Sequence, residues 1–240
     1  MNEKNTTYSR VLLKLSGEAL SGGSGSGFDT DVVARMADVI VRMARAGVQV
    51  AVVCGAGNFW RGRDAKDMVR ANADYIGMLG TLMNSLMLSD AIERAGVKTC
   101  VQSAIEVSRV AQTFHRKDAI EALESGRVVL FACGTGEPYF STDTTCVLRA
   151  LEIGADAILV AKNGVEGVLT GDPRDGGDYE LIDAITFDEL LARNLKVMDA
   201  TAFEMCRENG MTMHIFGMDD VENIYRAACG EKLGTQVTVD

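Results

Sequence analysis

Residues 29–57 read DTDVVARMADVIVRMARAGVQVAVVCGAG and contain three structural signals in succession. In residues 29–46, apolar side chains recur at helical spacing and charged residues take the other face, which predicts an amphipathic helix. Gly47 is expected to end this helix, because glycine adopts the left-handed backbone at low cost. Residues 48–54 are a short run rich in valine, which predicts a buried strand, and glycines follow it.

The same order of helix, glycine and apolar strand returns along the chain. Further helices are predicted at residues 74–95, 115–125 and 143–153, and Asp29 or Thr30 is expected to cap the first helix. Strands are predicted at residues 11–15, 48–54, 97–101, 128–133, 157–161 and 211–216. Strands that alternate with helices imply a mainly parallel sheet covered on both faces. We therefore expect one α/β domain over residues 1–240, a three-layer αβα sandwich with a flexible tail at residues 1–8.

The charge and the composition narrow the possible partners. The chain has 240 residues, of which 47% are hydrophobic, and a formal net charge of −10. Proteins that bind nucleic acid usually carry excess positive charge or a basic run, and this chain has neither. The first ten residues lack an apolar signal core, and no apolar run reaches the length of a membrane span. We therefore expect a cytoplasmic protein that binds neither nucleic acid nor a membrane.

The cysteines and histidines give little support for a metal site. The six cysteines lack the paired spacing of zinc ligands, and the two histidines, His115 and His214, lie far apart. Buried, reduced thiols explain the cysteines best, and such thiols fit a reducing compartment. We expect no metal held by protein side chains alone.

Glycine-rich loops follow four of the predicted strands. They read KLSGE at residues 14–18, GAGNFWRGR at 55–63, GTGEPYFSTD at 134–143 and KNG at 162–164. The carboxyl ends of parallel strands form one edge of the sheet, where ligands bind. Glycine lets a phosphate approach the backbone N–H groups, and lysines and arginines beside it supply positive charge. A single loop of this kind could be only a tight turn, but the four together predict a polyphosphate site.

These loops do not match the common nucleotide-binding motifs. The P-loop needs a glycine directly before a lysine, and the chain contains no such pair. A dinucleotide fingerprint could begin at Gly55, but Trp60 stands where its third glycine belongs. Residues 115–118, HRKD, lack the downstream asparagine of the protein-kinase loop, and no DFG occurs. The predicted site therefore belongs to another class.

Several linked motifs resemble those of the bacterial UMP kinases, members of the amino-acid-kinase superfamily. They are LKLSGEAL at residues 13–20, the loops at 55–61 and 134–143, ADYIGMLGT at 73–81, AKNGVEGV at 161–168, GDP at 171–173 and LKVMD at 195–199. The resemblance extends from about residue 8 to residue 235. It implies the amino-acid-kinase fold and transfer of the γ-phosphoryl group of ATP to UMP, with Mg²⁺, in pyrimidine nucleotide synthesis.

The resemblance also implies roles for individual residues. ATP would be bound by Lys14, Ser16, Gly17, Gly57, Arg61, Asn163, Leu169 and Asp172. UMP would be bound by Ala56, Asp74, Thr135, Gly136, Glu137, Pro138, Tyr139, Phe140, Ser141 and Thr142. Many relatives have glycine at the position of Ala56. The residues expected to act in catalysis are Lys14, Asp143, Asp199 and Lys162.

Two aspartates are expected to orient Lys14 or the shell of the metal. These are Asp143 and Asp199, although Asp143 could instead serve only to cap the helix that follows it. The attacking phosphate of UMP has a second pKa of about 6, so it needs no catalytic base. Lys14 and Mg²⁺ would neutralise the charge that develops during in-line transfer.

Regulation and assembly are implied only in outline. Residues 21–27, SGGSGSG, lie where relatives carry a segment linked to activation by GTP, but an uncharged flexible connector is an equal alternative. The resemblance further implies inhibition by UTP and a homohexamer. Residues 78–88, rich in methionine and leucine, are either helix core or part of a contact between subunits.

Two rival functions remain open from the sequence. One is a related kinase that phosphorylates a carboxylate or a carbamate, which would not need Asp74 or the loop at residues 134–143 for a nucleoside. The other is a regulator that binds UMP or UTP without turnover, which could lose Lys14 at little cost.

Overall fold

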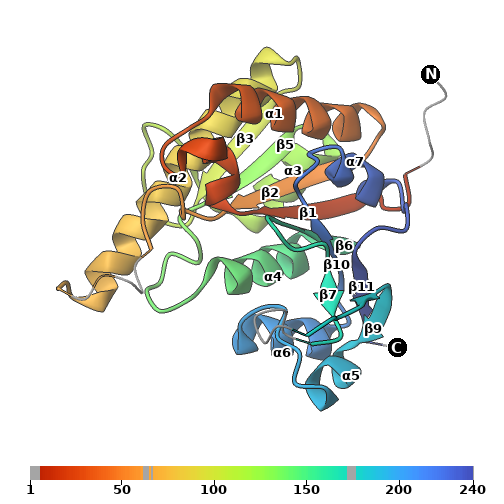
Figure 1. Ribbon diagram of the computed structural model, residues 1–240. Coiled ribbons are helices and arrows are strands. Elements are labelled where there is room, and N and C mark those ends of the chain that lie inside the picture. Colours follow the sequence, from red (N-terminus) through yellow and green to blue (C-terminus); the bar gives the residue numbers. More distant parts are fainter. Residues whose placement is uncertain (1–5, 62–64, 66, 172–176, 240) are drawn as a thin grey trace.

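A nine-stranded sheet forms the centre of the molecule (Figure 1). The computed structural model describes residues 6–61, 65, 67–171 and 177–239. Within these residues the strand order is β4-β3-β5-β2-β1-β6-β10-β11-β9, and β7 pairs with β8 in a separate ribbon. Every pairing in the large sheet is parallel except that of β10 with β11. The predicted mainly parallel sheet is confirmed.

The elements that build this fold alternate through most of the chain. They are β1 (Arg10–Leu15), the 3₁₀ helix η1 (Gly17–Ser24), α1 (Thr30–Arg45), β2 (Gln49–Cys54), α2 (Arg70–Arg94), β3 (Thr99–Ser103), β4 (Gln112–Thr113), α3 (Arg116–Glu124), β5 (Val128–Ala132), α4 (Thr142–Ile153), β6 (Ala157–Lys162), β7 (Val168–Leu169), β8 (Leu181–Ile182), β9 (Ala184–Thr186), α5 (Phe187–Ala192), α6 (Ala200–Asn209), β10 (Thr212–Gly217), α7 (Asn223–Ala228) and β11 (Thr235–Thr238).

Helices cover the sheet on both faces. Side chains of α1, α2 and α7 form one core with alternate strand residues such as Val11 and Leu13. Side chains of α3, α4, α5 and α6 form the other core with the intervening residues, such as Leu12. Figure 1 shows α1 above the sheet and α4 below it. Strands buried on both faces explain the continuous apolar runs in the sequence, and the predicted three layers are confirmed.

The helix ends test the expected caps. Asp29 caps α1, because its Oδ1 accepts from the N–H groups of Asp31 at 3.0 Å and Val32 at 3.1 Å. Gly47 has a φ of +90°, so it ends the helix in the left-handed conformation as predicted. Ser141, not Asp143, caps α4: the N–H of Thr144 donates to the Ser141 hydroxyl at 3.0 Å. The alternative role of Asp143 as a cap is therefore wrong.

The glycine-rich segment after β1 is more ordered than a loop prediction suggests. Its first four residues, 21–24, belong to the 3₁₀ segment η1, which has a kink at Gly22, where φ is +53°. The N–H of Gly27 then donates to the carbonyl of Asn58 at 3.1 Å, and that of Asp29 to the carbonyl of Leu20 at 2.8 Å. These bonds fix the segment just before α1 against the loop after β2 and against η1. Among the described residues, no helix combines the length and apolar character needed to cross a membrane.

Candidate nucleotide-binding site

A cavity of about 660 Å³ lies at the carboxyl ends of three neighbouring strands, β5, β2 and β1. The fourth strand that ends in a glycine-rich loop, β6, is next to β1 in the sheet, but its loop is not among the residues that line the cavity. The lining comes from the loops after β1, β2 and β5, from the first half of α2 and from residues 196–199. The topology therefore brings segments far apart in sequence to one edge, as the strand pattern predicted.

Close backbone approach explains the glycines in the first two loops. A Cβ atom on Gly17 would lie 2.5 Å from the carbonyl oxygen of Gly55 and 2.7 Å from the nitrogen of Gly57. A Cβ atom on Gly80 would lie 2.9 Å from the Cβ of Ala56, so α2 also approaches the second loop closely. The loop after β1 and the loop after β2 are therefore packed directly against each other, and both line the cavity.

A buried pair of amides fixes the second loop from behind. The Asn58 amide donates to Asn84 Oδ1 at 2.9 Å, and the Asn84 amide donates to Asn58 Oδ1 at 2.8 Å. Asn84 also donates to the carbonyl of Gly55 at 2.6 Å, and Asn58 to that of Gly27 at 2.9 Å. Both side chains are buried, so their polar atoms need these bonds. The network ties α2 and the start of α1 to the loop that lines the cavity.

Lys14 and Asp143 form an ion pair at the floor of the cavity. Lys14 lies on β1 and Asp143 in the first turn of α4, and the Lys14 Nζ–Asp143 Oδ1 distance is 2.9 Å. Both groups line the cavity. A carboxylate in the first turn also suits the dipole of α4. The pair therefore presents an oriented ammonium group to the open space.

Lys162 lies at the end of β6, behind the cavity wall. Its Nζ donates to the carbonyl of Val197 at 2.7 Å. Burial lowers the pKa of Lys162, the charge of Lys14 lowers it further, and Asp143 acts in the opposite direction. Lys162 does not itself line the cavity in the described residues, but it anchors the segment 196–199, which does.

Asp199 joins two helix starts at the same corner of the site. It caps α6 by accepting from the N–H of Ala202 at 3.0 Å. The hydroxyl of Ser141 donates to Asp199 Oδ2, and that of Thr144 donates to Oδ1 at 3.2 Å. The carboxylate that meets Lys14 is that of Asp143, whereas Asp199 holds the start of α4 against the start of α6.

Arg61 lies over the first two loops and pairs with a carboxylate of the first. Its guanidinium contacts Glu18 of η1, and both side chains are about half exposed. Arg61 lines the cavity together with Ser16, Gly17 and Gly57. The ion pair bridges the loop after β1 and the loop after β2 at the mouth of the cavity.

Asp74 contributes a carboxylate from α2 to the lining of the cavity. Its side chain is only 12% exposed, and it accepts from Arg70 Nε and from the backbone N–H of Tyr139. Of the ten residues expected to bind UMP, the cavity is lined by Ala56, Asp74, Thr135, Tyr139, Phe140, Ser141 and Thr142. The residues of this set that are not among its lining are Gly136, Glu137 and Pro138.

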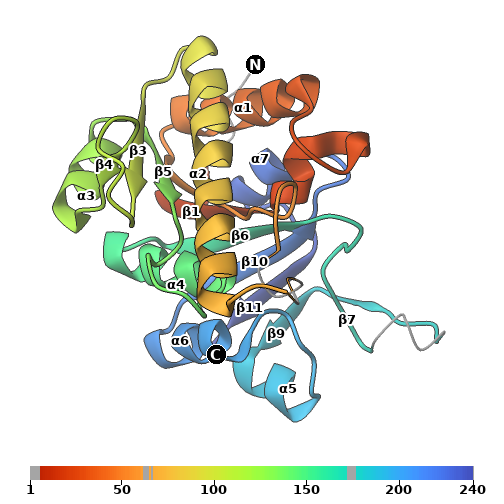
Figure 2. The same cartoon turned by 90° about the vertical axis from the view of Figure 1, so that its left-hand side faces the viewer.

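Asn163 and Leu169, two of the three residues expected to hold adenine and ribose, are not among the residues that line this cavity. Asn163 is exposed in the turn after β6, and Leu169 lies in β7, where it pairs with Leu181 of β8. Figure 2 shows β7 apart from the large sheet. Asp172 falls outside the described residues.

Some residues of the cavity carry no predicted role. Those with polar side chains are Trp60, Arg70, Thr81, Thr145 and Lys196. Trp60 lies inside a quoted loop, and its indole N–H donates to the carbonyl of Ala73 at 2.9 Å. Lys196 lies inside the LKVMD motif, so both had a sequence signal. Arg70 had only its spacing of four residues before Asp74, outside the helix predicted to begin at residue 74.

Comparison with known proteins agrees with this geometry. A parallel sheet with closely packed glycine loops and a lysine at one edge is typical of a phosphate-binding site. The sequence model of the amino acid kinase family matches residues 9–217. The chain is 51% identical to the uridylate kinase of Oenococcus oeni over 96% of each chain. It is 53% identical to that of Mycolicibacterium vanbaalenii, covering 96% of this chain and 92% of the relative.

Solved structures give the same result. The structure of UMP kinase from Bacillus anthracis superposes with a TM-score of 0.93 at 36% identity, covering 97% of both chains. Aspartate kinase from Synechocystis shares the fold at 19% identity, with a TM-score of 0.69 and 40% of its chain covered. The chain belongs to the amino acid kinase family and, within it, to the uridylate kinases, which confirms the resemblance found in the sequence.

Proposed function

We propose that the cavity at the carboxyl edge is where this chain transfers the γ-phosphoryl group of ATP to UMP, the reaction of the uridylate kinases, giving UDP. One observation carries the proposal: the four glycine-rich loops belong to four consecutive strands, and Lys14, paired with Asp143, lies where those strands end. A charged polyphosphate needs this combination of open backbone and fixed cation.

The ATP half would use the first two loops. Lys14 and the backbone N–H groups of Ser16, Gly17 and Gly57 would bind its phosphates. Arg61 would exchange Glu18 for a phosphate oxygen, since both side chains are exposed enough to move. Asn163, Leu169 and Asp172 would hold the adenine and the ribose.

The UMP half would use Asp74, Ala56 and the loop of residues 135–142. Asp74 is an acceptor, so it suits the hydroxyls of the ribose. The loop lies directly before α4, whose first turn carries Asp143. This arrangement would put the acceptor phosphate of UMP next to Lys14.

The residues would act by alignment and by neutralising charge. The phosphate of UMP is largely deprotonated near neutral pH, because its second pKa is about 6, so no base is required. The main obstacle is repulsion between two anionic phosphates. Lys14 would stabilise the transferring group, Asp143 would hold Lys14, and Lys162 and Asp199 would keep the surrounding segments in place.

Mg²⁺ fits this site as a partner of ATP. Among the described residues there is no group of three or more histidine, cysteine or acidic side chains able to hold a metal. Mg²⁺ characteristically binds through substrate phosphates, waters and one or two carboxylates, and Asp143, which lines the cavity next to Lys14, would be the carboxylate that holds it here. When bound, it would supply positive charge to the phosphate groups.

We also propose a homo-oligomer, a hexamer as in the resemblance, with GTP as activator and UTP as inhibitor. One face of α2 supports the assembly: Tyr75, Ile76, Leu79 and Met83 are each about 40% exposed. Exposed apolar side chains gathered on one face suit a contact between subunits. Met83→Glu should shift the mass measured by light scattering towards smaller species, and an unchanged mass would remove this support.

We also propose that the chain forms a single domain and that the protein is cytoplasmic. One sheet includes strands from β1 to β11, which supports a single domain over residues 1–240. The six cysteines are free thiols, which supports a reducing, cytoplasmic location.

A substrate panel tests the proposed reaction. ADP release would be measured with UMP, CMP, AMP, glutamate, aspartate and carbamate as acceptors, with and without GTP and UTP. We expect turnover with UMP above all others. A carboxylate or carbamate as preferred acceptor with no turnover of UMP would contradict the proposal, and binding of UMP without product would indicate a regulator.

A further inference from the structure

The long helix α2 carries two ion pairs of the same kind that differ in direction. Near its end Asp90 precedes Arg94, and the Arg94 Nε–Asp90 Oδ2 distance is 2.8 Å. At its start Arg70 precedes Asp74, and the Arg70 Nε–Asp74 Oδ1 distance is also 2.8 Å. An acid placed before a base suits the helix dipole, and the reverse order opposes it. Helix stability therefore explains the Asp90–Arg94 pair but not the Arg70–Asp74 pair.

The first turn of α2 gives the positive charge of Arg70 no acidic neighbour. Val69 precedes the helix without a side-chain cap, and the first turn contains no acidic residue. Unpaired N–H groups at this end carry partial positive charge, so a cation here is unfavourable for the helix. Residues that break a local rule in this way are often required by a functional site.

Arg70 contacts two residues of the UMP half of the cavity. Its Nε lies 2.8 Å and 2.9 Å from the two oxygens of Asp74. Its guanidinium carbon lies 5.8 Å from the centroid of the Tyr139 ring, within cation–π range. The backbone N–H of Tyr139 completes the triangle by donating to Asp74 Oδ2 at 2.9 Å.

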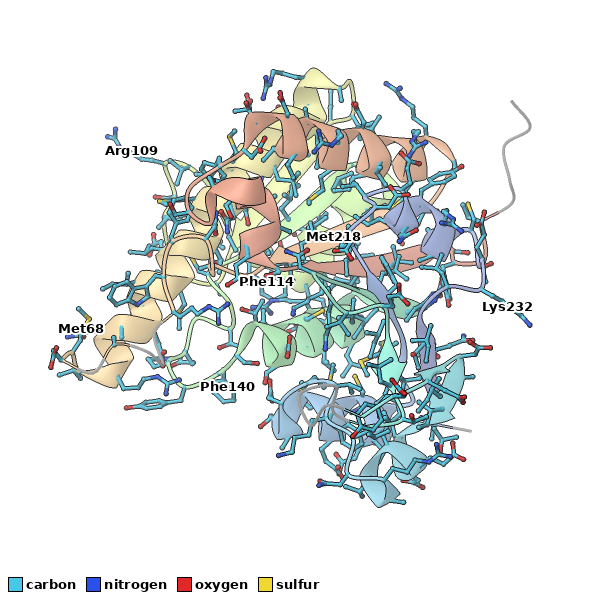
Figure 3. All side chains as sticks on the ribbon, viewed as in Figure 1. Met68, Arg109, Phe114, Phe140, Met218 and Lys232 are labelled. Atoms are coloured by element: carbon cyan, nitrogen blue, oxygen red, sulfur yellow. The ribbon has the colours of Figure 1, made fainter. Side chains whose placement is uncertain are left out.

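Tyr139 needs these contacts because its backbone is unfavourable. Its φ is +72°, in the left-handed region that side chains other than glycine rarely adopt, and its ring is exposed. In Figure 3 the next residue, Phe140, lies to the right of the N-terminal end of α2, near which Met68 is labelled. The contacts of Arg70 and Asp74 therefore hold this loop against α2.

The same contacts limit what Asp74 can accept. A carboxylate offers about four acceptor positions, two on each oxygen. Arg70 Nε uses one position on each oxygen and the Tyr139 N–H uses the second on Oδ2. Among the hydrogen bonds of the described residues, one position on Oδ1 is left over, enough for one hydroxyl of a ribose.

We propose that Arg70 is a positioning residue for UMP. It fixes the Asp74 carboxylate with one acceptor position directed to a single ribose hydroxyl, and it holds Tyr139 and the loop of residues 135–142 against α2. The inference rests on the proposed function, because it takes Asp74 and this loop as the UMP half of the site.

Steady-state kinetics of the full chain test the proposal, with Arg70→Gln as the variant and Arg94→Gln as its matched control. Both remove an arginine from an ion pair of four-residue spacing on the same helix, and the Arg94 pair is more than 60% exposed on both sides. The KM for UMP should rise about tenfold in Arg70→Gln, the size of a lost charged hydrogen bond, while kcat and the KM for ATP change by less than about twofold. Arg94→Gln should match the wild type.

Arg70→Lys provides a second measurement. It keeps the charge but lacks the planar Nε donor, so the KM for UMP should lie between those of the wild type and Arg70→Gln. An unchanged KM for UMP in Arg70→Gln, or equal changes for UMP and ATP, would overturn the positioning role. Absence of UMP turnover in the wild type would instead overturn the proposed function itself.

Discussion

The amino ends of the strands form one edge of the large sheet and their carboxyl ends form the other. Both edges are rich in glycine, for different physical reasons. At the amino edge, Gly47 and Gly126 end helices with φ values of +90° and +78°, and a Cβ atom on either would meet nothing within 4 Å. At the carboxyl edge, Gly17 has no such φ, but its Cβ would meet backbone atoms at 2.5 Å and 2.7 Å. The first edge needs the conformation of glycine and the second needs its small size. At the second edge this close approach brings the loops after β1 and β2 together at the wall of the cavity that Lys14 lines.

The largest expected difference between the two edges is the effect of a lysine substitution on turnover with UMP. Lys14 lies in the cavity, whereas Lys98 is exposed directly before β3 at the amino edge. We expect Lys14→Met to lower turnover with UMP by about 100- to 1,000-fold, because it removes the fixed charge at the transferring phosphate. Lys98→Met should leave turnover unchanged. Thermal unfolding of both variants would show that the fold persists, and equal turnover in both would break the distinction between the edges.

Gly17→Ala should produce the next largest effect. The added methyl group would push the loop after β1 away from the loop after β2, and a displacement of this kind can lower turnover by about 100-fold. Gly55→Ala is the matched control, since its Cβ would meet the nearest atom, the nitrogen of Gly17, at an ordinary 3.4 Å. Turnover with UMP should fall much less in Gly55→Ala. Similar losses in both variants would mean that close approach at Gly17 is not what the site requires.

Gly47→Ala should affect stability and not turnover. A left-handed conformation costs a residue with a Cβ atom about 1 kcal/mol, which should appear in the free energy of unfolding in urea. Gly47→Asn should lose less, because asparagine tolerates this conformation. A fall in the turnover of folded Gly47→Ala would show that the two edges are not independent.

His214 should give the smallest effect, one on stability alone. Its Nε2 lies 2.6 Å from the carbonyl oxygen of Leu233, and burial lowers the pKa of His214 below its ordinary value of 6.5 while this hydrogen bond acts in the opposite direction. The unfolded chain therefore binds the proton more readily, so this contribution to stability is present above pH 6.5 and is lost as the pH falls through the folded pKa.

Unfolding in urea at several pH values measures this contribution. His214→Gln should flatten the decline below pH 6.5. A decline that is unchanged in His214→Gln would assign the acid sensitivity to other groups.

The sequence predicted the fold well where its signals were periodic. The six apolar runs all became strands of the large sheet, because residues buried on both faces must be continuously apolar. The short strands β4, β7, β8, β9 and β11 have two to four residues and were not predicted, since so few residues show no period. The start of α2 at Arg70 was missed for a related reason, because it lacks a cap and an acidic first turn.

The site was predicted as a set of loops but not as a set of contacts. Ser141 caps α4 and also donates to Asp199, 58 residues away. This second contact depends on how α4 and α6 pack together. The pairing of Lys14 with Asp143 rather than Asp199 depends on the same packing. Spacing along the chain contains none of this information, so the residues were identified from the sequence while their partners required the structure.

A crystal structure with UMP and a non-hydrolysable ATP analogue tests the central claim most directly. We predict the two nucleotides in the cavity at the carboxyl edge, with the γ-phosphate beside Lys14 and Arg61, the ribose of UMP at Asp74 and its uracil against residues 135–142. Nucleotides bound at the amino edge, or an empty cavity with UMP bound elsewhere, would contradict the account.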